Sequence, residues 1–157
     1  MPENPITDDE ILYRRVPDNK GLLKIQPNGT FKISSQAFHD PNQRPSVDRA
    51  RLRENDPSRT LGPYSGGVTS IVTHDVRTID DLVQYDKDQR PIQDFIVDVE
   101  PKPIFDDPNE PDNYAHAEIY TNPLCPRRVF QRLCERLALL ANSRPWEIEP
   151  PILRDKA

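Results

Sequence analysis

The chain has 157 residues, which fits one domain with a single core. Its formal net charge of −5 argues against a general nucleic-acid binder, because such proteins are normally basic. No segment approaches the roughly 18 consecutive apolar residues of a membrane-spanning helix, and the N-terminus lacks the basic and apolar regions of a signal peptide. We therefore expect a cytoplasmic protein that makes no membrane contact.

The chain contains 18 prolines, about twice the usual frequency, and they cluster between apolar segments. This pattern predicts a folded domain with long, rigid loops rather than a disordered chain. A helix is predicted between Cys125 and Cys134, so the two side chains should point in different directions and remain reduced thiols.

In chain order, residues 1–10 are acidic and contain proline, and we expect a flexible arm there. A single α+β domain is expected over residues 11–142. Apolar runs bounded by turn residues predict strands over residues 11–16, 21–25, 30–34, 68–76, 95–99 and 117–120. Capping residues at their first positions predict short helical segments over residues 46–54 and 80–83.

The C-terminal helix is the strongest local prediction. Pro126 suits the first helical turn, and Asn142 and Pro145 end the segment. Apolar residues between them recur at spacings of one, three and four, which gives one amphipathic helix that should cover a mostly antiparallel sheet with long proline-rich loops. We expect residues 143–157 to form an extended tail, with Trp146 either docking on the domain or binding a partner.

Four short polar motifs each lie beside an apolar stretch: residues 13–15, 34–40, 45–49 and 114–118. Polar groups next to a core cost free energy unless they pair with one another or are reserved for a ligand. The motifs therefore predict either one converging site or an internal hydrogen-bond network. The three histidines lie in different predicted elements at spacings that are not typical of a ligand set, so we expect no metal.

The sequence resembles ADP-ribosyltransferase toxins in the order of three residue types, arginine, serine and glutamate. The corresponding residues here are Arg14, Ser34 or Ser35, and Glu118. The Leu-Tyr-Arg opening is also similar to that of the RES toxins, which consume NAD. The resemblance implies that Arg14 pairs the phosphates of NAD, that a serine supports the nicotinamide end, and that Glu118 binds the ribose. His116 stands where the protein-modifying transferases carry a second acid.

A second resemblance covers residues 11–122. The segments 35–40, 45–49 and 115–118 resemble a group of small bacterial proteins with no established function, whose pattern is Ser/Ala-Phe-x-Asp, Ser-Val-Asp and Asn-Pro-Ala-His-Ala. Tyr114 stands where that group usually carries proline. The resemblance implies a cytosolic bacterial protein and assigns no catalytic role.

The polar motifs also have a purely structural interpretation. Proline-rich loops bury little apolar surface of their own, so polar pairs could tie them to the sheet. The residues of such a network would be Asp40, Asp48, Arg49, Arg77 and His116.

Our first functional hypothesis is a cytosolic accessory protein that binds another macromolecule, a protein partner, through Trp146 and without a cofactor. By analogy of size, we expect such a protein in a toxin–antitoxin or defence operon. The alternative hypothesis is an NAD-cleaving or ADP-ribosyl-transferring enzyme built on Arg14, Ser34 or Ser35, and Glu118. The sequence makes no prediction of the oligomeric state.

Overall fold

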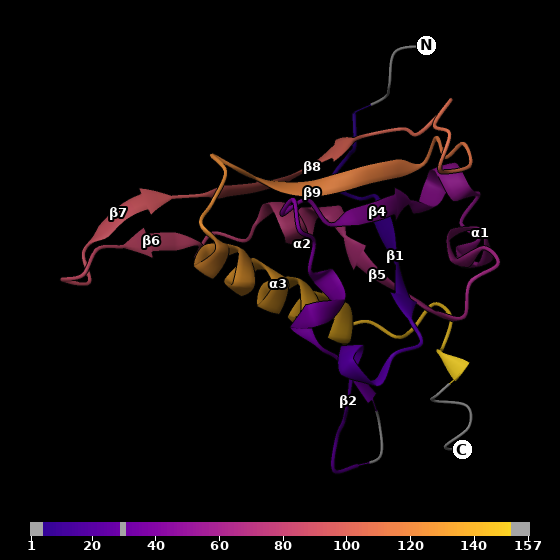
Figure 1. The fold of residues 1–157 in the computed structure, drawn as a ribbon, viewed down its shortest axis with the longest axis horizontal. Helices are drawn as coiled ribbons and strands as arrows, with labels where there is room; N and C mark the ends of the chain where they lie inside the picture. The colour runs from indigo at the N-terminus through magenta and orange to yellow at the C-terminus, as the bar shows by residue number, and fades with distance from the viewer. Residues whose placement is uncertain (1–4, 29–30, 152–157) are drawn as a thin grey trace.

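A computed structural model describes residues 5–28 and 31–151 of the chain. Its main feature is a five-stranded sheet in the order β5-β1-β4-β9-β8, in which every neighbouring pair is antiparallel (Figure 1). Its strands are β1 (Ile11–Pro17), β4 (Ser46–Arg49), β5 (Gly66–Val72), β8 (Ile96–Pro101) and β9 (His116–Asn122). The expected α+β fold with a mostly antiparallel sheet is confirmed.

Two small hairpins accompany the sheet. One pairs β2 (Leu23–Ile25) with β3 (Phe31–Ile33), which lie within two of the predicted strands, and the other pairs β6 (Val83–Tyr85) with β7 (Pro91–Asp94). The helices are α1 (Pro57–Leu61), α2 (Thr73–Arg77) and α3 (Arg127–Asn142), with 3-10 turns η1 (Lys20–Leu22), η2 (Ser35–Phe38) and η3 (Ala50–Arg53). Within the described residues, no helix is both long and apolar enough to cross a bilayer.

The two faces of the sheet differ because side chains alternate along each strand. One face, here the helix face, carries Leu12, Val47 and Ile119 and packs against α3 in the main core (Figure 1). Each such side chain contributes about 2 kcal/mol on burial. The opposite face, here the outer face, carries polar residues such as Asp48 and His116, which pair across β4 and β9.

Helix α3 confirms the amphipathic prediction. Its buried side chains recur with helical spacing and are Val129, Phe130, Leu133, Cys134, Leu137, Ala138 and Ala141. The helix ends at Asn142, and the side-chain amide of this residue forms two hydrogen bonds with the backbone of Ile33 in β3. Ile33 N donates to Asn142 Oδ1 at 2.8 Å, and Asn142 Nδ2 donates to Ile33 O at 3.0 Å. The last residue of the helix therefore anchors the first hairpin.

Three local predictions were wrong. Residues 46–54 form β4 and then η3 instead of one helix, because β4 pairs with β1 on one side and β9 on the other. The strand predicted over 68–76 ends at Val72 and continues as α2. No helix forms over 80–83, where the chain enters β6. Over residues 46–54 strand pairing overrides the local pattern, and β5 ends at Val72 because its partner Ile11 is the first residue of β1.

Residues 5–10, expected as a flexible arm, pack on the domain. Ile6 belongs to the main core, and Arg49 donates two hydrogen bonds to the buried carboxylate of Glu10, at 2.8 and 2.9 Å. Burial would raise the pKa of Glu10, but the hydrogen bonds from Arg49 and Thr7 and the charges of Arg49 and Arg51 outweigh it and lower that pKa. Residues 1–4 of the predicted N-terminal segment lie outside the described residues.

The tail also packs on the domain. Trp146 is half-buried against the main core, and Ile148 forms an antiparallel bridge with Val68 at the edge of β5. A side chain at Gly67 would place its Cβ 2.6 Å from the carbonyl oxygen of Ile148 and 2.8 Å from the ring of Pro150. Glycine is therefore needed where the tail crosses β5. The predicted tail residues 152–157 lie outside the described residues.

Candidate functional site

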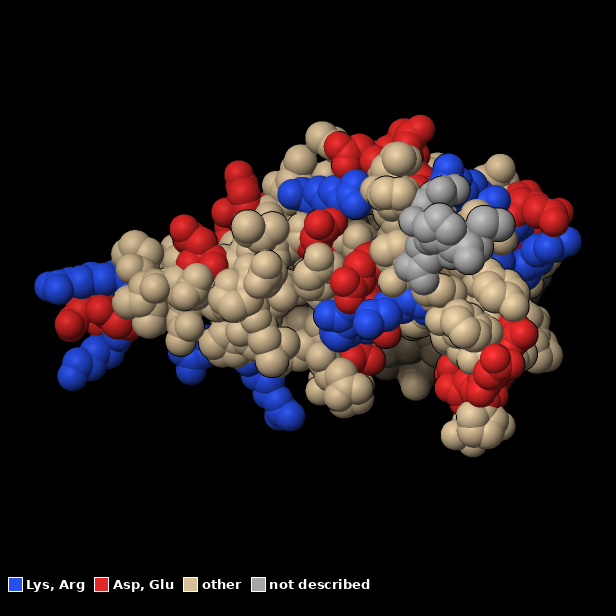
Figure 2. All heavy atoms as spheres, turned by 90° about the horizontal axis from the view of Figure 1, so that it is seen from above, with Lys and Arg blue, Asp and Glu red and all other residues tan. Residues whose placement is uncertain are grey.

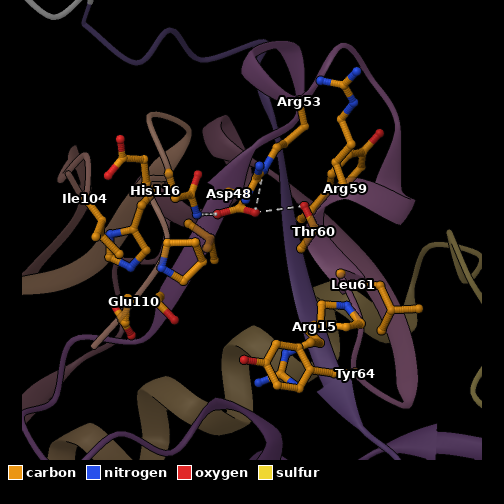
Figure 3. Close-up of a pocket in the computed structure, with 18 of the residues that line it drawn as sticks. Arg15, Asp48, Arg53, Arg59, Thr60, Leu61, Tyr64, Ile104, Glu110 and His116 are labelled. Atoms are coloured by element: carbon orange, nitrogen blue, oxygen red, sulfur yellow. Dashed lines mark hydrogen bonds and ion pairs between the residues drawn. The ribbon is translucent and has the colours of Figure 1, made fainter. Parts of the chain in front are cut away.

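A cleft of about 510 Å³ opens on the outer face, and three of the four polar motifs meet in it (Figure 3). The strand register places Ser70, Tyr13, Asp48 and His116 in one row across β5, β1, β4 and β9. Tyr13, Asp48 and His116 belong to the floor of the cleft, which is walled by residues 59–64 and by the loop over 104–113. The motif over 34–40 lies on the other side of the sheet.

Asp48 holds the two walls of the cleft in place. Its side chain is 8% exposed, and it accepts hydrogen bonds from Arg53 Nε at 3.0 Å and Thr60 Oγ1 at 2.9 Å on one side. On the other side, Asn113 Nδ2 donates to its second oxygen at 2.9 Å (Figure 3). A buried carboxylate is stable only with such partners, so the role of Asp48 is to position the two walls of the cleft.

His116 lies at the β9 end of the cleft floor, across the cleft from Arg59 (Figure 3). Its Nδ1 is 2.7 Å from the carbonyl oxygen of Lys102, which can only accept a hydrogen bond. Nδ1 therefore carries a proton, and in the neutral ring Nε2 is left as an acceptor. Burial, and then the charges of Glu147 and Asp56, raise the pKa of Tyr13 in the floor above its ordinary value of 10.0, so this residue stays a neutral phenol.

The walls of the cleft carry opposite charges. Arg15, Arg53 and Arg59 line one side, and Glu110 and Asp112 line the other (Figure 3). The cleft therefore suits a ligand of low net charge with polar groups at both ends.

The residues of the NAD hypothesis do not meet. Arg14 extends from the helix face of β1, where its Nε and Nη2 donate to Ala37 O at 2.9 and 2.7 Å and its Nη1 donates to Ser46 O at 2.6 Å. Removal from water lowers the pKa of Arg14 to about 10, so it stays charged at neutral pH. Ser34 accepts a hydrogen bond from Gln36 N as the cap of η2.

Glu118 points to the outer face, because it pairs with Ser46 in β4, one residue out of phase with Ala117 in the core. Arg44 forms ion pairs with Glu118 and with Glu100 in the neighbouring strand. The sheet thus separates Arg14 from Glu118, and the carboxylate of Glu118 already has a cationic partner. Ser35 lies in η2 beside Ser34, on the side of Arg14.

The five residues of the predicted network lie in separate groups. Asp48 ties the cleft walls and Arg49 pairs with Glu10, as described above, while His116 binds Lys102 O. Asp40 accepts hydrogen bonds from the backbone of Asn42 and Arg44, at 2.9 and 3.0 Å. Arg77 binds Asp98 and Asp8, each at 2.7 Å. Asp48, Arg49, Arg77 and His116 each tie a separate segment to the sheet, whereas Asp40 braces the backbone of its own loop.

The β6–β7 hairpin is an exposed feature that was not predicted from the sequence. Residues 83–94, here called the arm, project from one end of the body (Figure 1), and charged side chains gather at the tip (Figure 2). Leu82 and Phe95 are buried at its base, and Phe95 N donates to Leu82 O at 3.0 Å. Beyond this base the arm exposes 48% of Tyr85 and 56% of Ile92.

Further apolar side chains lie at the same end of the molecule. Ile96 begins β8 directly after the arm and is 67% exposed, and Leu124 precedes α3 and is 73% exposed. Ile96 pairs with Asn122, two residues before Leu124. The end that carries the arm therefore holds four of the large apolar side chains that face solvent.

A groove of about 860 Å³ separates the arm from the first turns of α3. Lys87 of the arm and Arg127, Arg128 and Arg132 of the helix line it, against a single acid, Asp86. Arg132 donates to Val83 O at 2.7 Å and fixes the arm to the helix. The groove is therefore basic, although the chain as a whole is acidic.

The cysteines offer no reactive group, since both are buried and free and burial raises the pKa of Cys134 to about 12. Among the described residues, no three His, Cys, Asp or Glu side chains gather closely enough to hold a metal ion.

No model of a known protein family matches the chain, and no curated protein or solved structure matches it either.

Proposed function

We propose that this chain is a cytoplasmic accessory protein that binds a protein partner through the arm and the basic groove beside it. One observation carries the proposal: a two-stranded hairpin extends from the body with Tyr85 and Ile92 about half exposed. An isolated hairpin is marginally stable in water, and uncovered apolar side chains gathered at one end are typical of a docking surface.

The groove indicates the chemistry of the partner. Lys87, Arg127 and Arg128 form no ion pair with any residue that the structure describes. The first turn of a helix also carries partial positive charge from its free N–H groups. A partner surface with carboxylates beside apolar side chains would match both features. The free, buried cysteines support a reducing compartment.

We therefore propose the arm, instead of Trp146, as the partner surface. Trp146 packs against the main core beside the end of α3, so its ring serves the fold. The toxin–antitoxin or defence setting stays a prediction, because no residue of the structure bears on it.

Photo-crosslinking tests the proposal. A photoreactive side chain at Ile92 should join the chain to one protein in a lysate of its host, whereas the same side chain at Leu139, which is 52% exposed on α3, should not. Charge reversal at Arg127 and Arg128 should abolish the crosslink from Ile92. Equal crosslinking from both positions, or a crosslink only between two copies of this chain, would contradict the proposal.

A further inference from the structure

Arg15 and Tyr64 form a stacked pair in the outer-face cleft, which is separate from the groove beside the arm. Strand β1 directs Arg15 to the outer face opposite Val68, and Tyr64 follows α1 on the wall of the cleft. The guanidinium carbon of Arg15 lies 4.2 Å from the centroid of the Tyr64 ring, which is 59% exposed. Figure 3 shows the two side chains stacked at the side of the cleft.

The stacking leaves the hydrogen-bond donors of Arg15 available. A guanidinium that lies over an aromatic ring uses its face, whereas its N–H groups point outward in its own plane. Arg15 makes no hydrogen bond or ion pair with any residue that the structure describes. The other arginines of this cleft are occupied, because Arg53 binds Asp48 and Arg59 lies 3.4 Å from Glu54.

Contacts within the cleft hold the Arg15 side chain and both walls in place. Asp48 links both walls, and the ring of Tyr64 restrains the guanidinium, so a ligand would order few side chains on binding. The volume of about 510 Å³ is within the range of small-molecule sites. Glu110 and Asp112 on the opposite wall would repel a ligand with several negative charges.

We propose that the outer-face cleft binds a small molecule with one carboxylate, which Arg15 holds through two parallel hydrogen bonds while stacked on Tyr64. The planar fork of arginine matches the two oxygens of a carboxylate. The acidic opposite wall favours this single charge over a phosphate dianion. The site is separate from the groove of the arm, so the proposal stands or fails independently of the protein-binding function.

NMR titration of the full chain, labelled with ¹⁵N, tests this site. Benzoate is the probe, and benzamide, which has the same shape without the charge, is its matched control. We expect benzoate to give saturable shifts at the Arg15 Nε–H and at the Tyr64 amide, and benzamide to give none. Inorganic phosphate should bind more weakly than benzoate.

Three variants make the result specific. Arg15→Gln should weaken benzoate binding at least about tenfold, and Arg15→Lys, which keeps the charge without the fork, by a few fold. The control is Arg136→Gln. Arg136 lies on α3, on the other side of the sheet from the cleft, and pairs with Asp81, so this variant should keep the wild-type affinity for benzoate.

Four results would overturn the proposal. These are the absence of saturable shifts in the folded wild-type chain, equal binding of benzoate and benzamide, tighter binding of phosphate, and shifts centred on the groove of the arm. If Arg15→Gln does not fold, Tyr64→Leu replaces it, because that side chain is mostly exposed. Unchanged benzoate affinity in the folded Tyr64→Leu variant would also overturn the proposal.

Discussion

In the outer-face cleft, the buried carboxylate of Asp48 accepts hydrogen bonds from three side chains that come from both walls. In the arm, by contrast, Tyr85 and Ile92 leave about half of their surface in water, and the buried contacts lie at its base. The fold itself requires the first arrangement, because an unpaired carboxylate at that depth would be costly. It does not require the second, and this exposed apolar surface is the reason for proposing the arm as a docking surface.

Loss of the Asp48 carboxylate should give the largest effect on stability. Asp48→Ala leaves Arg53, Thr60 and Asn113 without their acceptor in a buried site, and we expect the free energy of unfolding to fall by about 3–5 kcal/mol. Urea unfolding followed by circular dichroism measures this loss. A loss under about 1 kcal/mol would mean that water replaces the carboxylate and that the cleft is not held together by it.

Disruption of the Glu10–Arg49 ion pair should give the second-largest loss in the free energy of unfolding. Glu10→Gln removes the charge that faces the buried guanidinium, at an expected cost of about 3 kcal/mol at neutral pH. The folded-state pKa of Glu10 lies below its usual 4.5, so its stabilising contribution is present above pH 4.5 and is lost as the pH falls through the folded-state value.

The pH dependence gives this prediction its own control. The difference in stability between wild type and Glu10→Gln should shrink below pH 4.5. A difference that stays constant down to the acid transition would show that the pKa of Glu10 is the same in the folded and unfolded chain.

Displacement of the tail should cost less. In Gly67→Ala the new Cβ would clash with the backbone of Ile148 and the ring of Pro150, and we expect a loss of about 2 kcal/mol. Gly21→Ala is the matched control, since its Cβ would meet only the movable side chain of Asn19, at 3.2 Å. Thermal unfolding compares them, and equal midpoints would contradict the docked position of the tail.

Substitutions in the arm should affect stability least. A double variant, Tyr85→Ser with Ile92→Ser, changes exposed side chains, so we expect its free energy of unfolding to stay within about 0.5 kcal/mol of wild type. The same variant should lose the partner that crosslinks from Ile92. A large loss of stability would instead assign the two side chains to the fold.

The sequence predicted the elements that carry their own periodic signal. Helix α3 begins and ends within a residue of the expected positions, and the strands containing Leu12, Val97 and Ile119 were identified from their apolar residues. The arm was missed because β6 and β7 are short and mostly polar, and a bulge between Gln84 and Tyr85 interrupts their pairing. Such strands carry neither an apolar alternation nor a two-residue turn signal.

The candidate cleft was predicted only in part. The polar motifs indicated that Asp48 and His116 belong near one site, and the register of three strands brings them together with Tyr13. Arg15 stood in the same motif as Arg14, but the choice between them depends on which face of β1 each occupies. That choice is made by pairing with β4 and β5, which are distant in sequence. The wall residues come from loops without a recognisable motif.

Hydrogen exchange measured by mass spectrometry, on the free chain and on its complex with the crosslinked partner, tests the contrast between cleft and arm most directly. We predict that amides over residues 83–94 exchange quickly in the free chain and at least about tenfold more slowly in the complex, whereas β4 and β9 exchange slowly in both. Slow exchange of the arm in the free chain, or new protection in the complex that falls on the cleft and spares the arm, would contradict the assignment of the arm as the partner surface.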